Sequence, residues 1–233
     1  MLQFGYWPVK GLGEKTRWLL AYLHRDYEEV NPSFGDWFNP ASEKSKLSYG
    51  FAFPNVPFVI DGAVKVTESE AVNLYLVEKA GRSEMLGTTP EEKALVRSVE
   101  GVFHDVRNEI RFYFFQEDGK DKAKEALVGG KTADKVTQLD AFLEGRKGPF
   151  TLGGSEPTLA DFHVAALYYQ LDATLRTYGL NEGAPSMTNM KRIYENLAAL
   201  APIAAYLKTD TSKRPFCPPA FIKNIDNLVE LHV

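Results

Sequence analysis

Apolar residues in the first eighty positions recur with spacings that predict strands and helices in turn. Residues 2–7 form a run typical of a strand, ended by Pro8. Leu12, Thr16, Leu19, Leu20 and Leu23 fall at helical spacing and predict a helix with one buried face. Residues 27–31 predict a second strand. The turn-rich residues 32–52 predict a loop with a short helix near 42–47.

Two further apolar runs, residues 58–60 and 64–66, are rich in β-branched and aromatic side chains. The Asp61-Gly62 pair between them is typical of a tight hairpin turn. Ser69 follows the second run and is predicted to cap a helix that continues to about residue 80. This order of elements predicts one small mixed sheet covered by helices.

After a linker-like stretch of residues 81–90, the pattern becomes almost entirely helical. Thr89 and Glu92 form a capping box before a long amphipathic run that reaches Phe114. Residues 123–143 predict a second helix, and Thr158 with Asp161 caps a strongly apolar third helix. Residues 189–207 predict a last helical segment. The predicted fold is an α/β domain over residues 1–82 followed by an all-α domain over residues 90–233.

Composition excludes several classes of function. The 233 residues are 44% hydrophobic and 25% charged, with a formal net charge of -4, so neither nucleic acid nor an anionic membrane is an expected partner. No apolar run reaches 18 residues. The single cysteine, Cys217, excludes an intrachain disulfide and fits a cytoplasmic location. The four histidines lack ligand spacing, so no metal site is expected.

One segment offers two ways to hold a small peptide with a carboxylate. Pro57 opens a predicted strand, so a free backbone edge is expected just upstream at Val56. The helix that begins near Ser69 presents N–H groups and a partial positive charge to an anion. The same segment would therefore bind both a peptide backbone and its charged end.

This segment resembles the glutathione site of the cytosolic glutathione transferases. In that family a cis-proline follows a valine whose backbone pairs with glutathione, and an acidic or amide residue followed by serine binds the γ-glutamyl end. Val56-Pro57 and Glu68-Ser69 match those positions. The run Gly5-Tyr6-Trp7 with Gly11-Leu12 resembles the mu class in particular. The resemblance implies a thioredoxin-like N-terminal domain, glutathione as a co-substrate and no cofactor.

Tyr6 is the candidate catalytic residue. The reaction of the family needs a thiolate, and the pKa of a free cysteine thiol is about 8.5. A hydroxyl that donates a hydrogen bond to the sulfur favours the charged form. The backbone N–H near Leu12, at the start of a helix, is expected to add to this effect.

The resemblance also implies the residues that hold the two substrates. For glutathione they are Trp7, Leu12, Lys46, Asn55, Val56, Pro57, Glu68 and Ser69. Asp105 matches a residue that reaches into the site of a partner subunit, which implies a homodimer. For the small electrophile, the predicted pocket consists of Val9, His104, Asn108, Arg111, Phe115 and Cys217.

The chain departs from the mu pattern at several of these positions. Pro40 replaces the tryptophan that donates to the glycine carboxylate, and Trp37 is a hypothetical substitute. Glu68 replaces a glutamine, and Phe115 replaces a tyrosine of the electrophile pocket. The predicted function is conjugation of glutathione to electrophiles, as in detoxification. Two alternatives remain open: a non-catalytic ligand-binding or interaction protein on the same scaffold, and a glutathione-dependent isomerase or peroxidase.

Overall fold

The computed structural model describes residues 1–218 and Lys223, and the chain divides into two compact units. The first unit contains Met1–Arg82 together with Pro202–Cys217. The second contains Ser83–Ala201 and, among the later described residues, Pro218 and Lys223. The sequence predicted that everything after residue 90 belongs to the helical domain. The contacts instead group a late segment with the N-terminal unit.

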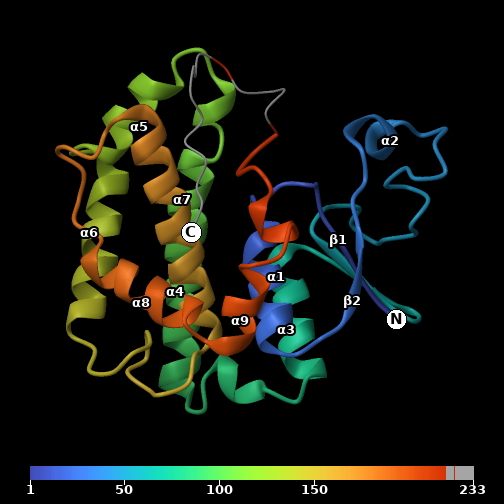
Figure 1. Cartoon of the computed structure of the whole chain (residues 1–233), viewed down its shortest axis with the longest axis horizontal. Helices are drawn as coiled ribbons and strands as arrows, with labels where there is room; N and C mark the ends of the chain where they lie inside the picture. The colour runs from blue at the N-terminus through green and yellow to red at the C-terminus, as the bar shows by residue number, and fades with distance from the viewer. Residues whose placement is uncertain (219–222, 224–233) are drawn as a thin grey trace. The chain divides into compact units, whose positions relative to one another are not determined.

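The first unit contains a four-stranded mixed sheet, as predicted (Figure 1). Its strands are β1 (Leu2–Gly5), β2 (Tyr27–Val30), β3 (Phe58–Asp61) and β4 (Val64–Thr67), in the order β2-β1-β3-β4. Strand β1 is parallel to β2 and antiparallel to β3, with Gly5 opposite Phe58. A Cβ atom at Gly5 would lie 2.0 Å from the Phe58 ring, so glycine is needed here for close approach.

Two helices of this unit, α1 (Gly13–Tyr22) and α3 (Ser69–Lys79), pack against each other. Their contact includes buried polar pairs: the Thr16 hydroxyl donates to Asn73 over 2.9 Å, and Lys15 pairs with Glu70 at 2.5 Å. The prediction that Ser69 caps α3 is wrong by one position. Glu68 precedes the first helical residue, and its backbone φ is 70°.

The loop after β2 contains a helix at a different place from the predicted one. Helix α2 spans Phe34–Phe38, and the Ser33 hydroxyl caps it by accepting from the Asp36 N–H over 3.0 Å. Residues 42–47 form turns instead. The serine followed three residues later by an aspartate was the missed signal. Helix α2 contributes Trp37 to a buried aromatic cluster with Phe51 and Phe58.

The second unit is helical, as predicted. Its helices are α4 (Pro90–Ile110), α5 (Gly119–Leu127), α6 (Lys131–Glu144), α7 (Leu159–Tyr178) and α8 (Thr188–Ala198), and α9 (Ala201–Tyr206) begins at its end. Short 3-10 turns lie at Ser83–Leu86 and Tyr113–Phe115 of this unit, and another lies at Thr211–Lys213 of the first unit. Helix α7 is buried over most of its length and contacts α4, α5 and α8, which makes it the centre of this unit (Figure 1).

Three predicted helices end earlier or divide. The run predicted to reach Phe114 ends at Ile110. The predicted helix over 123–143 is two helices, since Gly129 takes a φ of 88° and Gly130 precedes α6. The segment 189–207 is likewise divided between α8 and α9.

Both predicted capping boxes are present. Glu92 N–H donates to the Thr89 hydroxyl over 3.2 Å. The fully buried Asp161 accepts from the N–H of Thr158 over 2.7 Å and from that of Thr151 over 2.5 Å. Within residues 1–218 and 223, no helix is long and apolar enough to cross a membrane.

Candidate functional site

Tyr6 is the first residue after β1, and the end of the neighbouring edge strand β2 holds its backbone. Its N–H donates to the Val30 carbonyl over 3.1 Å, and its own carbonyl accepts from the Asn31 side chain over 3.0 Å. The side chain is 6% exposed. Both backbone groups of Tyr6 are thus held by the end of β2.

The hydroxyl of Tyr6 is held from the start of α1. The Leu12 N–H donates to the Tyr6 oxygen over 2.9 Å. In this structure the tyrosine oxygen accepts the Leu12 N–H, and the predicted contribution of that N–H to the thiolate stays a prediction. The bond uses an oxygen lone pair, so the proton of the hydroxyl stays available for donation to another acceptor.

Two glycines make room for the tyrosine. Gly11 adopts a φ of 40°, and a Cβ atom there would lie 2.8 Å from the Tyr6 oxygen. A Cβ atom at Gly13 would lie 2.4 Å from ring carbon Cδ1. Side chains at these two positions would therefore push the ring away from Leu12.

The residues predicted to hold the glutathione backbone and γ-glutamyl end form one cluster. The Val56–Pro57 bond is cis, as predicted. The Asn55 side chain accepts from the Val56 N–H over 2.9 Å and donates to Glu68 over 2.9 Å. Ser69 is buried at the first turn of α3, beside Glu68. In this structure the Asn55 side chain therefore occupies the backbone N–H of Val56, which was predicted to be free for a peptide.

Trp7 and Lys46 approach the same aromatic side chain of α2. The Trp7 ring lies 6.4 Å from the Phe38 ring, and the Lys46 ammonium lies 5.1 Å above it. Trp37, in contrast, is 2% exposed and stacks on Phe58 at 6.0 Å. Its burial argues against the predicted role of Trp37 at the glycine carboxylate.

The predicted electrophile residues fall in both units, so their common pocket stays a prediction. In the second unit, Asn108 and Arg111 are exposed, and His104 and Phe115 are partly buried. The Arg111 guanidinium lies 4.3 Å from the Phe112 ring. In the first unit, Val9 and Cys217 are buried, and burial raises the pKa of the Cys217 thiol to about 12.

Asp105, the predicted contact to a partner subunit, lies on α4. Its side chain is 60% exposed and forms an ion pair with Lys135 of α6. The carboxylate is therefore accessible, but a neighbouring cation of the same chain already binds it.

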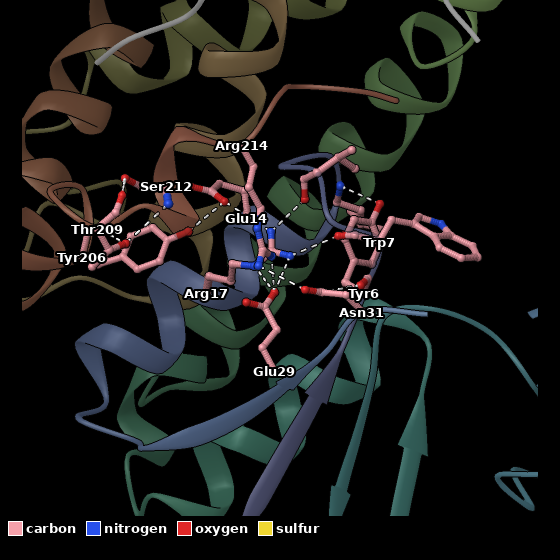
Figure 2. A network of polar contacts seen from close by, with 12 residues as sticks. Tyr6, Trp7, Glu14, Arg17, Glu29, Asn31, Tyr206, Thr209, Ser212 and Arg214 are labelled. Atoms are coloured by element: carbon pink, nitrogen blue, oxygen red, sulfur yellow. Dashed lines mark hydrogen bonds and ion pairs between the residues drawn. The ribbon is translucent and has the colours of Figure 1, made fainter. Parts of the chain in front are cut away.

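Sequence reasoning missed a set of charged residues behind Tyr6. Arg17 is fully buried and pairs with Glu14 and Glu29, and two residues of the late segment, Tyr206 and Arg214, bind these carboxylates (Figure 2). The available signal was the run of charged side chains inside a helix predicted to have one buried face. Their partners lie far along the chain and have no sequence pattern.

A mixed sheet with a cis-proline beside a helix N-terminus, followed by a helical unit, defines the class of glutathione transferases. Residues 2–78 match the family described as Glutathione S-transferase, N-terminal domain, and residues 104–210 match Glutathione S-transferase, C-terminal domain. Together these matches cover most of the chain.

Individual proteins agree with this assignment. Glutathione S-transferase Mu 1 of Oryctolagus cuniculus is 32% identical over 95% of this chain and 96% of its own length. The class-mu 26 kDa isozyme of Schistosoma mansoni is 38% identical over 74% of this chain and 82% of its own length. The solved structure of NaGST-2 superposes with a TM-score of 0.68 at 26% identity, covering 90% of this chain and 96% of that one. The chain belongs to the glutathione S-transferase family and resembles its mu class. It is an enzyme of glutathione conjugation.

Proposed function

We propose that Tyr6 activates glutathione by donating its hydroxyl hydrogen to the cysteinyl sulfur. The thiol proton passes to solvent, and the thiolate attacks an electrophilic carbon of the second substrate. A carbon–sulfur bond forms, and either a leaving group departs or an acceptor double bond takes up the electron pair and then a proton. The bond from the Leu12 N–H to the Tyr6 oxygen is the observation that carries this proposal, because it directs the hydroxyl and leaves its proton free.

The size of the effect follows from thiol chemistry. Lowering the pKa of a thiol from about 8.5 by two units makes the thiolate the main species at neutral pH, and corresponds to roughly 2.7 kcal/mol. A hydrogen bond accepted by the tyrosine oxygen polarises its O–H bond and strengthens it as a donor. Leu12 thus acts on the thiolate through Tyr6.

Glutathione binds in the first unit, across the residues that hold its two ends. Lys46 and Trp7 bind the glycine carboxylate, and both already lie against the Phe38 ring. Glu68 and Ser69 bind the γ-glutamyl end at the start of α3, where the N–H groups of the first turn and their partial positive charge favour a carboxylate. When the cysteinyl backbone pairs with Val56, it replaces the Asn55 side chain on the Val56 N–H.

The second substrate is a small or polar electrophile. Asn108 and Arg111 of the predicted pocket are exposed polar side chains, and covering an arginine with a large apolar ring without a new partner is costly. The enzyme acts as a homodimer in the cytoplasm, with Asp105 contributing to the partner's glutathione site. The exposed carboxylate on α4 supports the dimer, and the single cysteine supports the location.

A panel of electrophiles tests the reaction. Purified protein is assayed with glutathione and aryl halides, enals or hydroperoxides, and binding of glutathione is measured by calorimetry. Conjugates of small enals and aryl halides are the expected products. Binding without turnover of any substrate would identify a ligand-binding protein. Reduction of hydroperoxides alone would identify a peroxidase.

A further inference from the structure

We propose that the segment Tyr206–Phe216 is a positioning element for Tyr6, with Arg214 as its central residue. The inference rests on the proposed role of Tyr6 and extends it to a part of the chain about two hundred residues away. All the residues involved belong to the first unit.

The segment holds the loop between Tyr6 and α1 through its backbone. The Pro215 carbonyl accepts from the Lys10 N–H over 2.9 Å, and the Phe216 carbonyl accepts from the Gly11 N–H over 3.0 Å. The next residue of the loop is Leu12, whose N–H binds the Tyr6 hydroxyl. Two carbonyls of the late segment therefore fix the loop directly before the donor to Tyr6.

Arg214 reaches the other side of the tyrosine through its side chain. One guanidinium nitrogen binds Glu29 at 2.6 Å, and the other donates to the Asn31 side-chain oxygen over 3.1 Å (Figure 2). Asn31 in turn donates to the Tyr6 carbonyl over 3.0 Å. Arg214 thus orients the amide that holds the backbone of Tyr6.

Arg214 shares the Glu29 carboxylate with Arg17, and Arg17 connects the segment to Tyr6 a second time. Glu29 binds the buried Arg17 at 2.7 Å, and Arg17 donates to the carbonyls of Val9 over 2.9 Å and Trp7 over 3.3 Å. The Arg17 guanidinium also lies 5.8 Å from the centre of the Tyr6 ring. Arg17 therefore fixes the backbone after Tyr6 and lies against its aromatic ring.

Tyr206 closes the network at Glu14, to which its hydroxyl donates over 3.0 Å. Burial alone would raise the pKa of Glu29, but Arg17 and Arg214 lower it below its ordinary value. Burial raises the pKa of Glu14 despite the nearby Arg17. Removing one cation from such a cluster leaves a buried carboxylate poorly compensated, so the remaining groups rearrange.

The consequence for the reaction is specific. A small displacement of Leu12 or of the Tyr6 backbone weakens the hydrogen bond to the sulfur, because such bonds depend steeply on distance and angle. Apart from Trp7 and Leu12, the residues of the first unit proposed to bind the glutathione peptide lie elsewhere, between Lys46 and Ser69. Loss of the positioning element should therefore raise the pKa of the bound thiol and lower kcat, with little change in the KM for glutathione.

The test compares Arg214→Met with Lys213→Met in the full-length protein. Lys213 is the neighbouring cation, but its partner is the exposed Asp210 of the same turn. Arg214→Met is expected to raise the pKa of the bound thiol by about half a unit or more, which lowers the ratio of thiolate to thiol in the complex roughly threefold or more. Lys213→Met should match the wild type. The readouts are the pH profile of kcat/KM, the thiolate absorbance of the glutathione complex, and the KM for glutathione.

Two further variants keep the test decisive. Arg214→Lys retains the charge, so the pKa of its bound thiol should lie between those of Arg214→Met and the wild type. A general loss of stability would not explain such a partial rescue. If Arg214→Met does not fold, Tyr206→Phe removes only the hydroxyl on Glu14 and should shift the thiol titration in the same direction.

The outcomes separate this inference from the proposed function. If Tyr6→Phe shifts the titration but Arg214→Met and Tyr206→Phe overlap the wild type, the positioning role is overturned and the role of Tyr6 stands. If Tyr6→Phe leaves the titration unchanged, the proposed role of Tyr6 is itself wrong.

Discussion

The backbone N–H of Leu12 donates a hydrogen bond to the hydroxyl oxygen of Tyr6 over 2.9 Å. The bond joins the end of β1 to the start of α1 and determines where the tyrosine proton can point. Since Leu12 is already used in this way, the hydroxyl becomes the single group of this pair that can donate to a bound sulfur. The activity should therefore depend strongly on the hydroxyl itself.

Tyr6→Phe removes that hydroxyl and keeps the ring, so packing should change little. The pKa of the bound thiol should climb back toward its solution value of about 8.5, and kcat at neutral pH should fall by about tenfold to a hundredfold. The loss should shrink as the pH rises, because the thiol then ionises without help. The measurement is the pH profile of kcat/KM together with the thiolate absorbance of the complex.

Tyr75→Phe is the matched control for this variant. It also removes one tyrosine hydroxyl of the first unit, there bonded to Asp61 over 2.7 Å. Its kinetics should equal those of the wild type. If Tyr6→Phe kept the wild-type kcat at neutral pH, a group other than the Tyr6 hydroxyl would have to donate to the sulfur.

Gly13→Ala tests the space around the tyrosine. The added methyl carbon would lie 2.4 Å from the Tyr6 ring, so the ring has to move. We expect kcat to fall by about tenfold, since a small misplacement of a catalytic group is costly. Gly101→Ala is the control, because a Cβ atom there meets nothing within 4 Å and alanine favours the helix. Equal activity of both variants would show that the ring tolerates displacement.

Local sequence patterns predicted much of the fold. The Asp61-Gly62 turn lies between β3 and β4, and the capping box of Thr89 begins α4. These features depend on residues close together in the chain, so a short stretch of sequence is enough to predict them. The same holds for helix α2, where Ser33 and Asp36 carried a signal that was overlooked.

The support behind Tyr6 could not be predicted in this way. Arg214 and Glu29 are 185 positions apart, and no local sequence pattern around either residue predicts that they pair. A buried arginine becomes acceptable only when the fold brings carboxylates and carbonyls to it. The pairing of Leu12 with Tyr6 likewise depends on the left-handed turn at Gly11, whose purpose appears only in three dimensions.

Cys217 should be nearly inert toward thiol reagents. Burial raises the pKa of its thiol to about 12, whereas an exposed cysteine titrates at about 8.5. Since only the thiolate reacts, alkylation at pH 8 should be about a thousandfold slower in the native than in the denatured protein. The unfolded chain also loses this proton first, so the thiol's contribution to stability should fall as the pH rises above about 8.5.

The measurement for Cys217 is the rate of iodoacetamide labelling, followed by mass spectrometry, with and without denaturant. The stability effect is tested against Cys217→Ala, which should lose less stability between pH 8 and alkaline conditions. Rapid labelling of the native protein would contradict the buried environment of the thiol.

Asp105→Ala tests both the predicted homodimer and the reach of α4 into a partner's site. If Asp105 binds the glutathione amine of the other subunit, its loss removes an interaction made equally in the ground and transition states. The KM for glutathione should then rise by about threefold to tenfold, with a smaller change in kcat. Lys135→Ala is the matched control, because Lys135 competes for the same carboxylate and its loss frees Asp105. This variant should leave the KM for glutathione unchanged or lower it. Sedimentation of the wild type should give a dimer. An active monomer, or an unchanged KM in Asp105→Ala, would contradict the proposal.

Because Asp105 and Lys135 are both exposed, neither variant should unfold the chain, so a change in KM reports on binding.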